Sequence, residues 1–229
     1  MAKTILIIGG IGGGKSASLR NIPAEKSMYI AADLKGLPWV GYQKKWKTVK
    51  TDTGKTDFSK TNFYETNSFD AVLKISRAVN EVLLDREYLI IDTVSNLMTD
   101  VTMNRATERG YDKFTEMAAQ FWHYFREVAK YRDDLTVMFL WHTDLNVDAT
   151  GVIRKSIFIP SGKLLIEKAK PASIMDVIVE AKPNNDPDIK FPYVFSFENN
   201  GTTITRRPMG LFDGVDVMDN DVMLIVNEL

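Results

Sequence analysis

The segment TILIIGGIGGGKSAS, at residues 4–18, constrains the fold of this chain more than any other part of the sequence. Residues 5–8 form an apolar run without alternation, which is typical of a strand buried on both faces of a parallel sheet. Glycines follow this run, and the residues from Ser16 onward can start a helix. A buried strand, a glycine-rich loop and a helix start, in this order, indicate an α/β fold.

The glycine-rich loop matches a phosphate-binding motif, G-x-x-x-x-G-K-[ST], at every fixed position between residues 9 and 16. In this motif, glycines let backbone N–H groups converge on phosphate oxygens, the lysine reaches the β- and γ-phosphates, and the hydroxyl ligates Mg²⁺. The alternative is a glycine-rich turn followed by an incidental Lys-Ser pair, but the motif and its context favour a site for ATP and Mg²⁺. The predicted nucleotide-binding residues are Gly9, Gly10, Ile11, Gly12, Gly13, Gly14, Lys15, Ser16 and Ala17, although the motif itself leaves positions 10, 12 and 13 free to vary.

A second acidic residue is needed to complete a metal site beside this loop. The stretch YLIIDTVS, at residues 88–95, supplies Asp92 at the carboxyl end of a predicted buried strand, where ligands bind in open α/β sheets. We expect Ser16 and Asp92 to hold Mg²⁺, with Asp92 acting through water or orienting the ion's shell. The alternative is that Asp92 only caps the following helix.

Two other predicted strands also end in polar side chains. Asp33 ends the strand at residues 27–33, where a carboxylate could polarise an attacking water; the alternative is a simple turn residue. His142 follows the apolar run at 135–141 and could sense the γ-phosphate and pass its loss to the next hairpin. The alternative for His142 is a surface or partly satisfied histidine. Lys15, Asp33, Asp92 and His142 are the predicted catalytic residues of the core.

The order of the remaining elements predicts the architecture. Strands and amphipathic helices alternate through the first two thirds of the chain, with helices at residues 68–85 and 113–132. The last third reads mostly as strands, including YVFSFEN and TTITRR joined by an Asn-Asn-Gly turn, before a closing helix. We therefore predict an α/β fold with a mostly parallel central sheet flanked by helices, and antiparallel strands in the C-terminal third. A single domain over residues 1–229 is expected.

Composition excludes several kinds of chemistry. The chain has no cysteine, which rules out disulfides, thiolate metal sites and cysteine nucleophiles. The formal net charge is −1, so a polyanion would have to bind at a local basic patch. No apolar stretch is long enough to span a bilayer, so we expect no membrane partner and a cytoplasmic location.

These features, in this order, resemble the RecA-like ATPase core. In that family, LIIDTVS corresponds to the Walker B strand, YIAAD to the position of a catalytic glutamate, and LWHTD to a glutamine or histidine sensor. The whole chain more closely resembles the single-domain RecA-like ATPases of bacteriophages, the Sak-type recombinases. The matching segments are distributed over nearly the full length of the chain: GGIGGGKS, LIIDTVSNL, FLWHTD, IPSGKLL, DVIVEAK and TRRPMGLFDG.

The resemblance implies Mg²⁺-dependent ATP hydrolysis, binding of single-stranded DNA, and annealing or strand exchange beside a single-strand DNA-binding protein. It also implies a homo-oligomer, as a ring or a filament, in the host cytoplasm. One departure is Asp33, which stands where the family has glutamate and is one methylene shorter. The family completes its site with basic residues from a neighbouring subunit, which makes Arg206 and Arg207 candidate catalytic residues and Lys163 a weaker candidate. The alternative for the arginine pair is a solvated strand end.

Three segments are candidates for contact with DNA. In this fold class, loops after the Walker B and sensor strands contact DNA, which points to residues 98–113 and 146–156. The third segment, YQKKWKTVK at 42–50, interleaves lysines with aromatic rings, a pattern suited to stacking bases of single-stranded nucleic acid. A solvated loop is the alternative for each. The candidate residues are Lys44, Lys45, Trp46, Lys47, Arg105, Arg109, Lys113, Arg154 and Lys155.

A different class of function also fits a phosphate-binding loop, namely a nucleotide or small-molecule kinase. Such a kinase usually carries an arginine-rich lid after its core helices, whereas the late part of this chain offers strands and scattered lysines. A regulatory GTPase is disfavoured because the guanine-reading N-K-x-D motif is absent from the sequence.

Overall fold

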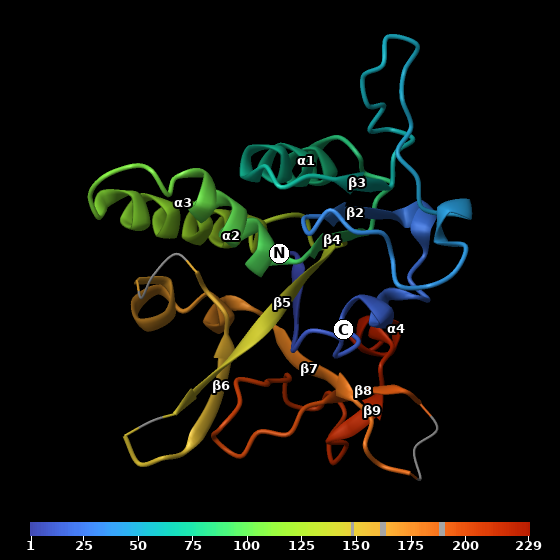
Figure 1. The fold of residues 1–229 in the computed structure, drawn as a ribbon. Helices are drawn as coiled ribbons and strands as arrows, with labels where there is room; N and C mark the ends of the chain where they lie inside the picture. Colours follow the sequence, from blue (N-terminus) through green and yellow to red (C-terminus); the bar gives the residue numbers. More distant parts are fainter. Residues whose placement is uncertain (148, 161–163, 188–190) are drawn as a thin grey trace.

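The computed structural model describes residues 1–147, 149–160, 164–187 and 191–229, and its centre is one twisted sheet (Figure 1). The strand order is β3-β2-β4-β5-β1-β7-β8-β9, and β6 pairs with the outer part of β5. The strands from β3 to β7 in this order are parallel, whereas β8, β9 and β6 pair antiparallel. Their bounds are β1 (Lys3–Gly9), β2 (Ser27–Ala31), β3 (Phe63–Glu65), β4 (Tyr88–Asp92), β5 (Thr136–Val147), β6 (Ile153–Ile157), β7 (Val177–Pro183), β8 (Tyr193–Ser196) and β9 (Val217–Asp219).

Both faces of the sheet are covered, as the unbroken apolar strands predict. On one face, Leu6 and Ile8 belong to a cluster with side chains of α1 (Phe69–Glu81), α2 (Val94–Asn104) and α3 (Asp112–Val128). On the other face, Ile5 and Ile7 lie in a second cluster with side chains of α4 (Val222–Val226). The expected mostly parallel sheet flanked by helices, with antiparallel strands near the C-terminus, is therefore confirmed.

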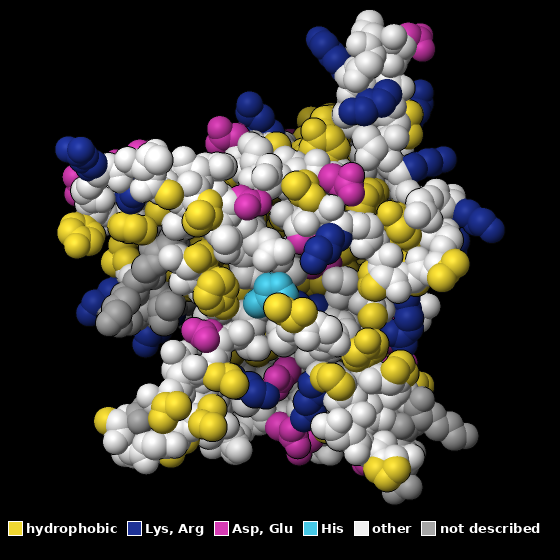
Figure 2. Space-filling model, viewed as in Figure 1, with side chains coloured by type: hydrophobic (Ala, Val, Ile, Leu, Met, Phe, Trp, Pro, Cys, Tyr) yellow, Lys and Arg dark blue, Asp and Glu magenta, His cyan; other side chains and the backbone are white. Residues whose placement is uncertain are grey.

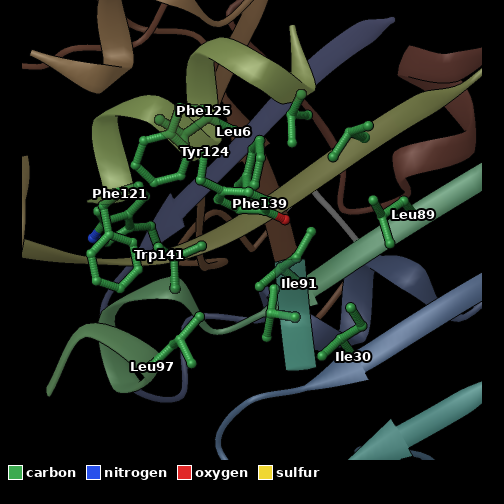
Figure 3. Close-up of a cluster of buried hydrophobic side chains, with 14 of the residues drawn as sticks. Leu6, Ile30, Leu89, Ile91, Leu97, Phe121, Tyr124, Phe125, Phe139 and Trp141 are labelled. Atoms are coloured by element: carbon green, nitrogen blue, oxygen red, sulfur yellow. The ribbon is translucent and has the colours of Figure 1, made fainter. Parts of the chain in front are cut away.

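Aromatic rings fill the space between α3 and β5 (Figure 3). The rings of Phe125 and Phe139 meet edge to face with centroids 5.4 Å apart, and Phe125 also packs on Trp141 at 5.5 Å. Edge-to-face pairs add about 0.5–1.5 kcal/mol beyond the burial of their area. This packing fixes β5 at the centre of the sheet, and with it the strand end that carries His142.

Two local expectations were wrong. The helix expected after the glycine-rich loop is only a four-residue 3₁₀ turn, η1 (Ser16–Leu19). The chain must reach β2 at Ser27, and Pro23 disfavours helical geometry at the residue before it. The expected hairpin of YVFSFEN and TTITRR also does not form, because β9 takes the free edge of β8. Arg206 instead makes an isolated antiparallel bridge to Ile178 of β7.

A long excursion between β2 and β3 projects from the molecule at the upper right of Figure 1. Lys and Arg side chains stand along this projection in Figure 2, and the exposed lysines of the excursion are Lys35, Lys44, Lys45, Lys47, Lys50, Lys55 and Lys60. Trp46, however, is 4% exposed, and its ring meets that of Tyr29 at 5.6 Å. The expectation that Trp46 stacks on a base is therefore wrong, because its indole is part of the core beneath the lysines.

No helix in the described part of the chain is long and apolar enough to cross a membrane.

The burial of Trp46 gives a stability prediction. Trp46→Ala should lower the free energy of unfolding by about 3–5 kcal/mol, since it removes a buried aromatic side chain and leaves a cavity. Urea unfolding of the two proteins measures this difference, and Trp46→Phe should lose less because it keeps a ring. A Trp46→Ala protein that unfolds at the wild-type urea concentration would show that the indole does not support the core.

Candidate functional site

Three adjacent strands, β4, β5 and β1, bring most of the predicted site together where β4 and β1 end beside the middle of β5. Gly9 of β1 is paired with His142 of β5, and Asp92 of β4 is paired with Leu140 of β5. The ends of these strands and the loop after β2 line a cleft of about 380 Å³, a size in the range of small-molecule sites. Of the predicted residues, those that line it are Ile11, Gly12, Gly13, Gly14, Lys15, Ser16, Ala17, Asp33, Asp92 and His142.

The backbone of the glycine-rich loop fits closely against β7 and β8. A Cβ at Gly13 would lie 2.8 Å from the carbonyl oxygen of Ala181, and one at Gly14 would lie 2.6 Å from the ring of Tyr193. Gly12 has a φ of +73°, a left-handed conformation that side chains other than glycine rarely adopt. The structure thus requires glycine at positions 12 and 13, which the motif alone leaves free, whereas a Cβ at Gly10 would meet nothing within 4 Å.

Lys15 is only 6% exposed and turns back over the loop that carries it. Its ammonium donates hydrogen bonds to the carbonyl oxygens of Gly9 and Gly10, both at 2.8 Å. Its Nζ also lies 3.1 Å from Nδ1 of His142. Burial lowers the pKa of Lys15 to about 8, against the opposing attraction of Asp92 and Asp33.

His142 is half-buried beside this ammonium. Burial, and then the positive charge of Lys15, lower the pKa of His142, so the neutral imidazole is favoured. A neutral ring can accept a hydrogen bond from Lys15 at Nδ1 and carry its proton on Nε2. Its carbonyl oxygen accepts from the N–H of Phe158 at 2.8 Å, at the point where β5 leaves the sheet and pairs with β6.

Asp92 is 3% exposed, and one of its carboxylate oxygens, Oδ2, is shared by two hydroxyl groups. Ser16 donates to it at 2.5 Å, and Tyr29 of the neighbouring strand β2 donates to the same atom. Within the described residues, the other oxygen, Oδ1, is buried and has no hydrogen-bond partner. Burial raises the pKa of Asp92 to about 6, although the two hydroxyl hydrogen bonds act in the opposite direction.

The donor set fits a magnesium ion. Ser16 and Asp92 place a hydroxyl and a carboxylate in direct contact, and the unpartnered Oδ1 of Asp92 leaves acceptor capacity at the same point. Mg²⁺ prefers such oxygen donors and completes its octahedron with waters and substrate phosphates. These are the two residues that the sequence predicts as metal ligands.

Asp33 also lines the cleft, just beyond β2 and beside Asp92, whose carbonyl oxygen accepts a hydrogen bond from the backbone N–H of Asp33 at 3.3 Å. Its Oδ1 accepts a hydrogen bond from the backbone N–H of Lys35 at 3.2 Å, and burial raises its pKa. The predicted water-polarising residue therefore lines the same cleft as Lys15 and Asp92.

Sequence reasoning missed Tyr29 and Tyr193. Tyr29 is fully buried in β2, and only the register of β2 against β4 brings its hydroxyl to Asp92. Tyr193 begins β8 and covers Gly14, far away in the sequence. No local motif marks either residue, because both reach the site through strand pairing.

The two candidate arginines do not line this cleft. Arg207 is held within the chain, with its guanidinium over the ring of Phe197 at 5.4 Å and 3.6 Å from a carboxylate oxygen of Asp216. Arg206 is exposed, and its guanidinium lies near the carbonyl of Ser173. Lys163 lies outside the described residues.

Several candidate DNA contacts already have partners within the chain. Arg105 pairs with Glu108 and Glu116, and Lys113 donates to the carbonyl oxygens of Arg105, Ala106 and Glu108. Lys155 pairs at 2.7 Å with Glu180, and Arg154 donates to the carbonyl of Gly201. Arg109 is exposed, as are Lys44, Lys45 and Lys47.

No model of a known protein family matches the chain, and a search of the curated proteins also finds no match. The geometry described above therefore carries the functional argument.

The raised pKa of Asp92 gives a pH prediction. The folded state favours the protonated acid, so stability that is present near pH 3.8 is lost as the pH rises to about 6. Asp92→Asn keeps an acceptor for Ser16 and Tyr29 but removes the buried charge. It should raise the free energy of unfolding by about 1–3 kcal/mol at pH 7 and by much less at pH 4.

Urea unfolding of wild type and variant at the two pH values measures this effect. An equal difference between the two proteins at both pH values would contradict it.

Proposed function

We propose that this protein is a Mg²⁺-dependent ATPase of the RecA-like type that acts on single-stranded DNA. The observation that carries the proposal is the convergence of Lys15, the Ser16–Asp92 pair and His142 at the ends of three adjacent strands. This supports a triphosphate site because it joins a buried cation, a glycine-rich backbone cradle and a pair of oxygen donors.

In the proposed reaction, each residue of the site has a separate role. Lys15 exchanges its carbonyl partners for phosphate oxygens, a stronger pairing for an ammonium that is buried. Ser16 and Asp92 would hold Mg²⁺, which neutralises charge on the β- and γ-phosphates when bound. Asp33, beside Asp92, would orient and polarise the attacking water. The shorter side chain of Asp33 predicts slower hydrolysis than a glutamate would give.

His142 connects the proposed nucleotide site to the β5–β6 hairpin. Its imidazole contacts the Lys15 ammonium, while its backbone stands where β5 becomes the β5–β6 hairpin. A shift of Lys15 toward a γ-phosphate removes the partner of His142. The hairpin is therefore the element most directly coupled to the state of the nucleotide.

Among the DNA candidates, the lysines of the excursion are favoured. Lys44, Lys45 and Lys47 are exposed on a projecting segment, whereas Arg105, Lys113 and Lys155 are engaged with acidic side chains or carbonyls. Exposed lysines supply phosphate contacts without sequence preference. The proposal includes assembly into a ring or filament, in which Arg206 is the better placed of the two arginines to serve a neighbouring site. Annealing or strand exchange beside a single-strand DNA-binding protein would be the output.

ATP turnover with and without single-stranded DNA tests the reaction. Turnover should rise when DNA is added, and Lys15→Ala should reduce it to background because, among the described residues that line the cleft, Lys15 is the only buried cation. Phosphate release is the readout, beside a measurement of particle mass. Transfer of phosphate to a small acceptor, with turnover insensitive to DNA, would instead support a kinase.

The excursion has its own test. Changing Lys44, Lys45 and Lys47 together to Ala should weaken binding of single-stranded DNA and make the salt dependence of binding shallower by about 2 in the log–log slope. A matched triple variant at Lys74, Lys130 and Lys168, exposed lysines elsewhere in the fold, should keep the wild-type slope. Equal slopes for the two triple variants would exclude the excursion from the DNA site.

A further inference from the structure

A second cavity, of about 360 Å³, continues from the cleft along the phosphate-binding loop. The two share Ala17, Pro38 and Tyr193 as lining residues. Ala17 directly follows the Lys15-Ser16 pair, so the second cavity begins where the loop ends. A nucleotide is a phosphate chain that continues into a sugar and a base, so a cradle for phosphates needs an adjoining space of this kind.

Asp92 lines the cleft but does not line this second cavity. Its walls come from η1, from the loop after β2, from the start of β8 and from the end of β9. Asp92 stands at the end of β4. In the sheet order, β4 lies on one side of β1, and β8 and β9 lie on the other. A triphosphate with its terminal phosphate at Ser16 and Asp92 would thus direct its other end toward the second cavity.

The walls have the chemistry of a base-binding slot. Trp39, Phe191 and Tyr193 supply aromatic rings, and Trp39 and Tyr193 are partly exposed. Arg20 is held in place, since it pairs with Asp219 at 2.9 Å and donates to the carbonyl oxygen of Asn220. Flat rings stack on any nucleobase, and each such contact contributes about 1–3 kcal/mol.

Asn220 adds a selective group to this slot. It is 1% exposed and lines the cavity, yet within the described residues neither its Oδ1 nor its Nδ2 has a hydrogen-bond partner. Leaving a buried amide unpaired costs about 1–3 kcal/mol, and such groups in native proteins call for an explanation. A ligand that brings one donor and one acceptor would satisfy both atoms.

We propose that this cavity is the subsite that binds the base of the nucleotide. Trp39 and Tyr193 stack on the base, and the side-chain amide of Asn220 hydrogen-bonds to it when it is adenine. The inference rests on the proposed function. An asparagine amide pairs bidentately with the N6 amino group and N7 of adenine. The same edge of guanine presents two acceptors, O6 and N7, which leave the amide oxygen of asparagine without a donor.

Calorimetric titration with Mg-ATP, Mg-GTP and Mg-tripolyphosphate separates the base from the phosphates. Wild type should bind ATP more tightly than either of the other two. Asn220→Ala and Trp39→Leu should each weaken ATP binding about 5- to 100-fold and leave tripolyphosphate binding unchanged. Trp39→Phe should recover most of the ATP affinity because it restores a flat ring.

The apo proteins provide a control on Asn220. Because its amide makes no hydrogen bond to the described residues, Asn220→Ala should keep or raise the melting temperature. A marked drop in melting temperature, together with weaker ATP binding, would assign the amide a structural role and overturn its role in recognition.

The remaining outcomes distinguish the subsite from the proposed function. An unchanged ratio of ATP to tripolyphosphate affinity in Asn220→Ala and Trp39→Leu would overturn the subsite while leaving the phosphate site intact. GTP binding as tight as ATP binding would overturn the choice of adenine. Failure of wild type to bind either ATP or tripolyphosphate, with Lys15→Ala no different, would overturn the proposed function and the subsite with it.

Discussion

The buried ammonium of Lys15 is the interaction on which the site depends. One cation is held by two carbonyls of its own loop and by His142 of β5, and is attracted by Asp92 and Asp33. A charge in such surroundings is costly unless it is paired, and the lowered pKa of Lys15 reflects that cost. The raised pKa of Asp92 reflects the same cost for the opposite charge. The proposed nucleotide and Mg²⁺ would give both charges a partner.

Strand order explains why these charges meet. Because β5 lies between β1 and β4, it brings His142 to Lys15, while Ser16 of the same loop reaches Asp92 at the end of β4. Aromatic packing against α3 holds β5 in the sheet, yet the strand continues past His142 into a hairpin outside it. The same strand is therefore packed in the core before His142 and paired only with β6 after it.

Much of the site could be predicted because its residues belong to short sequence patterns that can be recognised without the fold. Lys15, Asp33, Asp92 and His142 each follow an apolar run, and the ends of parallel strands meet at one edge. Trp46 was misjudged because its lysine neighbours suggest exposure, whereas burial depends on what the excursion packs against.

For a related reason, the sequence could not predict that Tyr29, Tyr193 and Asn220 lie at the site. Each acquires its neighbours from strand register or from distant loops rather than from adjacent residues. The short length of the η1 turn could not be predicted either. A nearby proline and a short connection to β2 prevent the longer helix that the local sequence favours.

The close fit of the glycine-rich loop against Ala181 has a consequence for how the protein folds. β1 lies between β5 and β7, so both of its partners come from residues 136 onward. The loop therefore receives its supporting wall only after the chain closes a contact of very high sequence separation, the slow kind in folding. During synthesis, an emerging chain that carries the whole motif still lacks the backbone surface that shapes it. The phosphate binding proposed for this loop should thus appear late, when the C-terminal third docks.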